Sequence, residues 1–282
     1  MERVLIVGVG FMGGSFASAL RKHGYKGKIF GYDINPESIR KGEDLGIIDK
    51  GTTILYEIGE FEPDFIMLSS PVRTFPEIAE KLERILDEDV IVTDQGSVKG
   101  SLVYKLESIL GKRYVGGHPI AGTEKSGVEF SMPNLYEGKK VILTPTENTD
   151  RERIEVVKKV WESIGGIVEY MDPFLHDYVF GVVSHLPHAV AFSLVDTLIR
   201  LSSREIDLFK YPGGGFKDFT RIAKSDPIMW RDIFLANKKN VLKSIDGFIE
   251  SLNYLRRLIE EEKEEELTEF LNEVKTKRME ID

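Results

Sequence analysis

A single histidine stands among four glycines and a proline in the stretch GGHPIAGTEKSG, residues 116–127. Glycine adopts backbone angles that other residues avoid and proline fixes a turn, so we expect a shaped loop rather than the interior of a helix or strand. An imidazole has an ordinary pKa of about 6.5 and can exchange a proton near neutral pH. The stretch therefore suggests acid–base chemistry at His118, although a lone loop histidine is more often a hydrogen-bonding surface residue.

A second unusual stretch is YPGGGFKDFTRIAKSDPIMWRDIFLANKKN, residues 211–240, in which Trp230 follows a break at Asp226-Pro227. Asp218 and Arg221 are three residues apart and would share one face of a helix, which is ordinarily a surface ion pair of little energetic weight. The planar guanidinium of Arg221 also matches a carboxylate with two parallel hydrogen bonds. Arg221 is therefore a candidate for holding a carboxylate substrate.

The segment SHLPHAVAFSLVDTLI carries His185 and His188 three residues apart. The two side chains would share a helix face if Pro187 lies in the first turn. Zinc would need further ligands, and no carboxylate or third histidine follows at ligand spacing. We therefore expect histidines that are hydrogen-bonded at a domain interface, and no metal site.

The elements that must position these residues begin with a dinucleotide-binding pattern. Residues 3–7, RVLIV, are typical of a buried parallel strand, and Gly8, Gly10 and Gly13 follow as G-x-G-x-x-G at the start of a helical segment. The glycines let the turn close and let the backbone approach a pyrophosphate, while the helix N-terminus offers free N–H groups. A βαβ unit without a ligand is the alternative, and the order and spacing of these features disfavour it.

A second strand, KIFGYD, ends at Asp33. A carboxylate at this place accepts hydrogen bonds from the ribose hydroxyls and repels a 2′-phosphate, so NAD is predicted rather than NADP. Residues 64–71, 90–97 and 141–146 are predicted strands that continue the same alternation of strands and helices. The first half of the chain therefore predicts an α/β, doubly wound fold.

Ligands in open α/β sheets lie beyond the carboxyl ends of the strands. Ser70, Pro71, Gly96 and Ser97 follow predicted strands and should face the cofactor crevice. The helical segment SVKGSLVYKLESIL begins at Ser97, so its hydroxyl would either cap that helix or face a ligand. The sequence alone does not decide between these two roles of Ser97.

The pattern changes to helices alone near residue 172. This predicts a dinucleotide-binding domain over residues 1–171 and an all-helical domain over residues 172–282. Apolar residues from Val241 to Ile259 alternate spacings of four and three, which is typical of a narrow seam between packed helices. We expect the seam to support a homodimer, and the run EEEKEEE at 260–266 to be a solvated face.

Composition excludes several classes of function. The 282 residues include no cysteine, which excludes disulfides, thiolate metal sites and a cysteine nucleophile. The net charge of −9, without a basic stripe, argues against a nucleic-acid partner. No apolar run approaches the roughly 18 residues of a membrane span, and the N-terminus runs into the glycine pattern without a signal-peptide cleavage site. We therefore expect a cytoplasmic protein with no membrane partner.

Six stretches, taken together and in order, resemble the prephenate dehydrogenase family of tyrosine biosynthesis over nearly the whole chain. They are VGVGFMGGS, LSSPV, TDQGSVK, GGHPIAGTEKSG, SHLPHA and GGGFKDFTRIAKSDPIMW. The resemblance implies an N-terminal Rossmann domain, a helical dimerisation domain, and NAD-dependent oxidation of prephenate to 4-hydroxyphenylpyruvate and carbon dioxide. It also names tyrosine as a candidate feedback inhibitor. Neither a fused chorismate mutase domain nor a regulatory domain, which some relatives carry, is expected here.

The same resemblance implies roles for individual residues. It makes His118 the catalytic histidine, supported by Ser97 at the substrate hydroxyl. The residues matched to substrate binding are Thr123, Glu124, His188, Gly214, Asp218, Arg221 and Trp230. Those matched to cofactor binding are Gly8, Gly10, Phe11, Met12, Gly13, Asp33, Ser70 and Pro71.

The implied chemistry explains these residue types. A hydride leaves ring carbon C4 of prephenate while neutral His118 accepts the hydroxyl proton, and Arg221 suits the side-chain carboxylate that persists in the product. Three alternatives are the same reaction on arogenate, a β-hydroxyacid dehydrogenase with a catalytic lysine, and an NAD(H) sensor without turnover. The HPIAGTE loop counts against the second. The third leaves His118 and Arg221 without a shared purpose.

Overall fold

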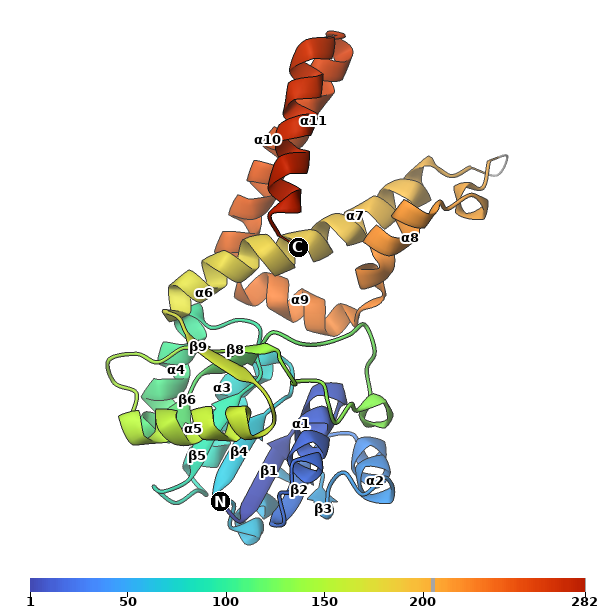
Figure 1. Cartoon of the computed structure of the whole chain (residues 1–282). Coiled ribbons are helices and arrows are strands. Elements are labelled where there is room, and N and C mark those ends of the chain that lie inside the picture. Colours follow the sequence, from blue (N-terminus) through green and yellow to red (C-terminus); the bar gives the residue numbers. More distant parts are fainter. Residues whose placement is uncertain (204–205, 282) are drawn as a thin grey trace.

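The structure is a computed structural model that describes residues 1–203 and 206–281. It consists of an α/β part built on two sheets and a part made only of helices, which follows the last strand, β9 (Ile167–Tyr170) (Figure 1). Helices α6 (Pro173–Phe180) and α9 (Pro227–Ala236) pack against the α/β part. The two parts therefore share an interface at which side chains from both can meet.

The main sheet has six parallel strands in the order β3-β2-β1-β4-β5-β6, which is the Rossmann order. The strands are β1 (Arg3–Val7), β2 (Lys28–Tyr32), β3 (Lys50–Thr52), β4 (Phe65–Leu68), β5 (Ile91–Asp94) and β6 (Tyr114–Val115). The helices of this part are α1 (Phe11–Lys22), α2 (Pro36–Asp44), α3 (Phe75–Glu83) and α4 (Gly100–Leu110). Alternate residues of β1 enter two apolar clusters, Val4 and Ile6 in one and Leu5 and Val7 in the other, so both faces of the sheet are covered.

A second sheet of three strands corrects two expectations. Strand β7 (Gly117–Pro119) runs antiparallel to β8 (Lys140–Leu143), and β8 pairs in parallel with β9 after the crossover helix α5 (Arg151–Ser163). The predicted strand at 141–146 therefore does not continue the main sheet. The glycine-rich stretch also does not form a loop throughout, because His118 is the central residue of β7.

Glycines explain how β7 fits there. A Cβ atom on Gly116 would lie 2.5 Å from Thr144 Oγ1, and one on Gly117 would lie 3.0 Å from the carbonyl oxygen of Asp94. Larger residues could not pass so close to β5 and β8. The glycines that suggested a turn thus allow a short strand to cross between the two sheets.

The helical part begins with one long rod. Helix α6 continues through a π-helical turn, Gly181–His185, into α7 (Leu186–Leu201). An 18-residue window of this rod has a mean hydropathy of 1.5, so by length and composition it is apolar enough to cross a membrane. The expectation that no apolar run approaches the length of a membrane span is therefore wrong. Only 22% of this window is buried within the chain, so most of the window lies outside the buried core.

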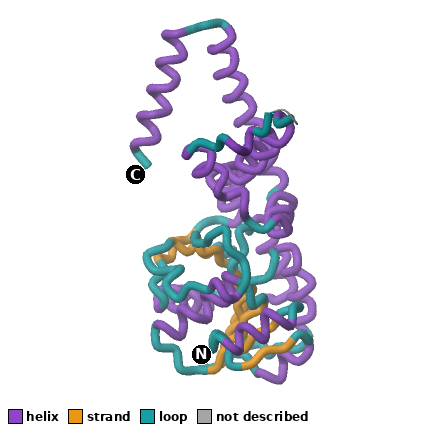
Figure 2. Tube along the Cα trace, turned by 90° about the vertical axis from the view of Figure 1, so that its right-hand side faces the viewer, coloured by secondary structure: helices purple, strands orange, loops and turns teal. Residues whose placement is uncertain are grey.

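The remaining helices are α8 (Gly214–Thr220), α9, α10 (Lys238–Glu260) and α11 (Glu264–Met279). Helices α10 and α11 form a hairpin that projects from the body, with the connecting turn at its far tip and the C-terminal end of α11 standing apart from the rest of the chain (Figure 2). Large apolar side chains are exposed on the rod and the hairpin: Phe174, Leu175, Val183, Ile199, Leu201, Leu252, Ile259, Leu271 and Val274. An apolar surface of this extent is typical of a protein interface.

Candidate active site

The glycine-rich turn after β1 has the geometry of a pyrophosphate cradle. Gly8 has a φ of +102°, and a Cβ there would lie 2.6 Å from the backbone nitrogen of Ser70. A Cβ on Gly13 would collide with the carbonyl oxygen of Gly8, whereas one on Gly10 would meet nothing within 4 Å. Gly10 precedes α1 with no side-chain cap, so the first N–H groups of the helix are free to bind an anion. These residues fit a dinucleotide.

Asp33 follows β2, directly beside this turn. Its Oδ2 accepts a hydrogen bond from Val9 N at 2.9 Å, and its Oδ1 accepts one from Asn35 N at 2.8 Å. Burial raises the pKa of Asp33, while the two backbone N–H groups oppose that effect. The carboxylate is therefore held at a fixed place next to the glycines, as binding of a ribose requires.

The other residues matched to cofactor binding surround the same turn. Phe11 is buried in the core, and the carbonyl of Met12 accepts a hydrogen bond from Tyr136 Oη at 2.9 Å. Ser70 and Pro71 follow β4, and Ser70 Oγ lies 2.8 Å from Thr74 Oγ1. All four therefore lie at the carboxyl edge of the sheet or in the first turn of α1.

The buried amide of Gln95 contacts the glycine-rich turn, and the sequence analysis did not single out this residue. Gln95 Nε2 donates to Ser69 Oγ at 2.8 Å, and Tyr136 Oη donates to Gln95 Oε1 at 2.6 Å. These contacts join the ends of β4 and β5 to the segment before β8. Only the fold brings Tyr136 to this place.

His118 lies where the two parts of the molecule meet. Its Nδ1 is 2.8 Å from Nε2 of His176 on α6, and its ring packs edge-on against Phe180 with the centroids 4.9 Å apart. Burial lowers the pKa of His118 well below its usual range, and the positive potential of His176, Lys99 and His185 lowers it further. The imidazole is therefore neutral at neutral pH, which is the form that can accept a proton.

The sequence analysis missed His176 and Asp177, which continue the hydrogen bonding behind His118. His176 Nδ1 lies 3.0 Å from Asp177 Oδ1, and the same oxygen accepts the backbone N–H of Lys99 at 2.7 Å. Burial lowers the pKa of His176 to about 2 and raises the pKa of Asp177 to about 6. The only sequence feature that could have pointed to these two residues is the adjacent His-Asp pair at the start of the all-helical part.

Ser97 does not cap a helix, so that alternative is wrong. Helix α4 begins at Gly100, and its N-cap residue is Lys99, whose N–H is bound to Asp177 and whose ammonium contacts Asp94. These buried contacts hold Lys99 outside the helical region, with φ −121° and ψ −72°. In the part of the chain that the structure describes, no hydrogen bond joins Ser97 Oγ to His118.

The loop that carries Ser97 nevertheless reaches the helical part. Its next residue, Val98, packs in one buried cluster with Trp230 and Ile233 of α9. The ring of His188 stacks on Trp230 with the centroids 3.6 Å apart, so the structure brings the Ser97 loop, His188 and Trp230 together.

His185 and His188 lie at the start of α7 with Pro187 in its first turn, as predicted. Nδ1 of His188 is 3.0 Å from the carbonyl oxygen of Ser184, and Nδ1 of His185 is 3.1 Å from Asn237 Nδ2. Burial lowers the pKa of both rings, to about 4 for His185. Among the residues described, no group of three or more His, Asp or Glu side chains is arranged to hold a metal ion.

The guanidinium of Arg221 forms its ion pair with Glu124, not with Asp218. Helix α8 ends at Thr220, and Arg221 begins a 3₁₀ turn, Arg221–Lys224. The guanidinium instead donates to Glu124 Oε2 at 2.8 Å, across the two parts of the molecule. The turn that begins at Arg221 packs against α7, the helix that carries His188. Burial lowers the pKa of His188, the hydrogen bond to the Ser184 carbonyl opposes that effect, and the charge of Arg221 lowers the pKa further.

Three other residues matched to substrate binding, Thr123, Gly214 and Asp218, are exposed. Thr123 Oγ1 accepts a hydrogen bond from Lys125 N at 3.2 Å within the loop after β7. Gly214 and Asp218 lie on the exposed surface of α8. The structure therefore brings His188 and Trp230 into direct contact and places Arg221 on a turn that packs against the same helix, α7.

Comparison with known proteins identifies the family. A family model for "Prephenate dehydrogenase, nucleotide-binding domain" matches residues 16–170, and one for "Prephenate dehydrogenase, dimerization domain" matches residues 172–273. The prephenate dehydrogenase of Bacillus subtilis is 35% identical over 280 residues, which are 98% of this chain and 75% of that protein. The cyclohexadienyl dehydrogenase of Zymomonas mobilis is 32% identical over 280 residues, 99% of this chain and 95% of that protein.

A solved structure is also similar. The crystal structure of prephenate dehydrogenase from A. aeolicus in complex with hydroxyphenyl propionate and NAD+ is 75% identical, with a TM-score of 0.97 over 100% of this chain and 99% of that one. The chain belongs to the prephenate dehydrogenase family.

Membership of the prephenate dehydrogenase family confirms the assignment made from the six sequence stretches. It also confirms the fold class, a Rossmann nucleotide-binding domain followed by a helical domain. The β-hydroxyacid dehydrogenase alternative is set aside.

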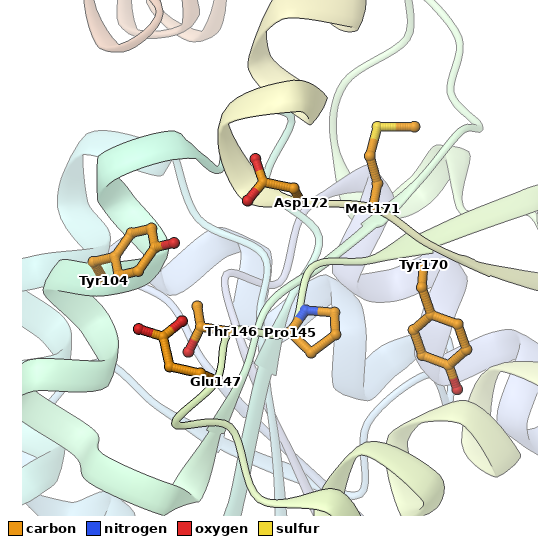
Figure 3. A pocket seen from close by; sticks show the side chains of 7 residues that line it. All are labelled: Tyr104, Pro145, Thr146, Glu147, Tyr170, Met171 and Asp172. Carbon is orange, nitrogen blue, oxygen red and sulfur yellow. The ribbon is translucent and has the colours of Figure 1, made fainter.

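One surface hollow of about 350 Å³ lies away from these residues (Figure 3). It is lined by Tyr104, Pro145, Thr146, Glu147, Tyr170, Met171 and Asp172. Its ionisable groups near neutral pH are two carboxylates, so it does not suit an anionic substrate of a prephenate dehydrogenase.

Proposed function

We propose that this chain catalyses the oxidative decarboxylation of prephenate with NAD, giving 4-hydroxyphenylpyruvate and carbon dioxide. The observation that carries the proposal is a neutral, half-buried His118 between a dinucleotide cradle and a helical part that presents Arg221. The chain is an NAD-dependent dehydrogenase of this family. The A. aeolicus relative, whose crystal structure holds NAD+ and hydroxyphenyl propionate, supports both the cofactor and a substrate with a six-membered ring and a carboxylate side chain.

The residues of the chain divide the work of the reaction. The nicotinamide ring of bound NAD supplies the acceptor for the hydride that leaves C4. As that C–H bond breaks, Nε2 of His118 takes the hydroxyl proton, because Nδ1 is already bound to His176. The bond from C1 to the ring carboxylate then breaks, carbon dioxide leaves, and its electron pair completes the aromatic ring. His118 returns the proton to the phenol oxygen, so the overall reaction takes up and releases no proton.

Arg221 is proposed to bind the side-chain carboxylate of the substrate. A guanidinium has five N–H donors, and one of its terminal nitrogens is used by Glu124. His188 and Trp230, stacked on each other, form a flat polar and aromatic surface beside it. We propose that Ser97 supports His118 at the substrate hydroxyl and that Thr123, Glu124, Gly214 and Asp218 line the entrance.

Asp33 is proposed to select NAD over NADP. Its carboxylate is fixed by Val9 N and Asn35 N beside the glycine-rich turn, where a 2′-phosphate would be repelled. We place the domain boundary between residues 171 and 172, in the link from β9 to α6.

We further propose that the enzyme is a cytoplasmic homodimer. The match of residues 172–273 to a dimerisation domain and the exposed apolar residues on α6, α7, α10 and α11 support pairing through the helical part. Tyrosine remains a candidate feedback inhibitor, and its carboxylate would suit the same Arg221.

One assay tests the proposed function. NADH formation is measured with prephenate and with arogenate, each with NAD and with NADP, and then with added tyrosine. We expect the largest kcat/KM with prephenate and NAD, and a weaker preference for NAD in Asp33→Ala. A larger kcat/KM with arogenate would assign the amino-acid substrate instead, as the match to a cyclohexadienyl dehydrogenase allows. Tight NAD binding without turnover of either substrate would favour the sensor.

A further inference from the structure

A line of hydrogen bonds leads from His118 to two buried side chains, His176 and Asp177. His118 Nδ1 is 2.8 Å from His176 Nε2, and His176 Nδ1 is 3.0 Å from Asp177 Oδ1. His176 is 0% exposed and Asp177 is 5% exposed, whereas His118 is half-buried. The line therefore runs from Nδ1 of His118 into the interface between the two parts of the molecule.

The contacts of Asp177 fix the charge at the inner end of the line. Its carboxylate lies at the N-terminus of α4, where the Lys99 N–H donates to Oδ1 at 2.7 Å and where helix N–H groups favour a negative charge. A Cβ on Gly100 would collide with Oδ2, so the closeness of this approach depends on glycine. Asn237 Nδ2 donates to the backbone carbonyl of Asp177 at 2.7 Å and holds α6 in place.

Other ionisable groups face the line from each neighbouring element. Lys99 approaches from the start of α4, but Asp94 of β5 binds its ammonium. His185 approaches from the π-helical turn and is itself held by Asn237. Asp177 is therefore the anion whose hydrogen bond to His176 continues the line.

The protonated nitrogen of each histidine ring can be assigned by starting at Asp177 and moving toward His118. A carboxylate can only accept, so Asp177 requires the proton of neutral His176 to be on Nδ1. Nε2 of His176 is then an acceptor, which requires the proton of neutral His118 to be on Nδ1. The remaining nitrogen of His118, Nε2, carries a free electron pair.

We propose that His176, aligned by Asp177, is a positioning residue that holds His118 in the Nδ1–H tautomer and so leaves Nε2 to receive the substrate proton. This rests on the proposed function for its catalytic meaning, although the tautomer can be measured without turnover. When His118 becomes an imidazolium, its Nδ1–H continues to donate to neutral His176, so no contact in the line has to break. Asp177 orients His176, as the carboxylate of a serine-protease triad orients the histidine beside it.

The first test is ¹H–¹⁵N correlation spectroscopy of ¹⁵N-histidine-labelled protein above pH 7. The chain has five histidines, so each ring can be assigned by substitution. We expect His118 to be in the Nδ1–H tautomer in the parent protein. His176→Phe should shift it toward Nε2–H, whereas His176→Gln, whose amide oxygen can still accept from Nδ1–H, should retain it. An Nε2–H tautomer in the parent, or no change in a folded His176→Phe, would overturn the proposal.

The second test compares kinetics in the same variants with prephenate and NAD. We expect His176→Phe and Asp177→Asn to lower kcat at least tenfold with KM changed less than threefold, and His176→Gln to recover most of the loss. His23→Gln, on the exposed surface of α1's C-terminus, is the matched control and should not change kcat. A kcat within threefold of the parent in His176→Phe would overturn the proposal. If no substrate turns over in the parent, the proposed function fails while the tautomer measurement still decides this inference.

Discussion

At the scale of single residues, His118 and Arg221 are expected to fail in different ways. His118→Asn keeps a polar side chain but removes the nitrogen that takes the proton, so kcat should fall by roughly 10²- to 10⁴-fold with a smaller change in KM. Burial holds the pKa of His118 well below its usual range, so the acid limb of kcat should lie well below pH 6.5. Steady-state kinetics from pH 4 to 8, restricted to the pH range in which each protein stays folded, measure both effects. If kcat of His118→Asn falls at the same low pH as kcat of the parent protein, another group accepts the substrate proton.

Arg221→Ala removes a contact that substrate and transition state share, so KM should rise about tenfold or more while kcat changes less. Arg40→Ala is the matched control, because Arg40 is also exposed and ion-paired but lies on α2, away from the site. Initial rates over a range of prephenate concentrations separate the two constants. A fall in kcat with KM unchanged would contradict a binding role.

Residue type and local spacing were enough to predict part of the site. The glycines, Asp33 and His118 stand in short motifs whose chemistry is local, and the structure gives each a geometry that fits it. His176 could not be predicted in the same way, because it lies 58 residues from His118 in the sequence and meets it only when α6 packs on β7.

At the scale of elements, the turn between β1 and α1 allows a matched pair of substitutions. Gly13→Ala would place a methyl group against the backbone of Gly8, so it should lower both the thermal midpoint and the affinity for NAD. Gly10→Ala meets no protein atom, so it should keep the thermal midpoint while weakening NAD, whose pyrophosphate approaches there. Calorimetric titration and thermal unfolding measure the two properties. Unchanged NAD affinity in Gly10→Ala would show that the cofactor does not approach Gly10.

Short elements limited what the sequence could predict. Strands β6 and β7 have two and three residues, too few for an alternating pattern, and they form because the chain is held between β5 and β8. The start of α4 was misplaced for a related reason, since buried contacts of Lys99 with Asp94 and Asp177 override the local preference for a serine cap.

At the scale of the whole molecule, the exposed apolar surface predicts a dimer. Leu252 is 52% exposed and Ile259 is 59% exposed, although both lie on the seam of α10. Light scattering at micromolar concentration should give about twice the chain mass of 32.0 kDa. The double substitution Leu252→Lys and Ile259→Lys should reduce that mass, whereas Lys26→Glu, on the Rossmann part, should not. A mass near that of one chain in the parent would show that the surface is left uncovered.

The buried histidines also make the stability of the whole molecule depend on pH. Burial lowers the pKa of His118, His176 and His185, so the folded chain holds these rings neutral at a pH where the unfolded chain protonates them. Asp177 has the opposite effect on the pH dependence of stability. Its pKa is raised to about 6, so as the pH falls the folded chain binds a proton at Asp177 before the unfolded chain does. Near pH 5, these four groups therefore take up three protons and release one on unfolding, a net uptake of about two.

The free energy of unfolding should then be highest above about pH 6.5 and fall as the pH drops toward 4, by about 3 kcal/mol per pH unit near pH 5. The sign follows from the lowered histidine pKa values, since the stability they contribute is present above the pKa of an unfolded histidine and is lost below it. Denaturant unfolding at pH 7.5, 6.0 and 5.0 measures the slope. His176→Gln removes one of the three groups and should reduce the net uptake by about one proton. Equal stability at pH 7.5 and 5.0 in the parent would mean that these rings are not neutral in the folded protein.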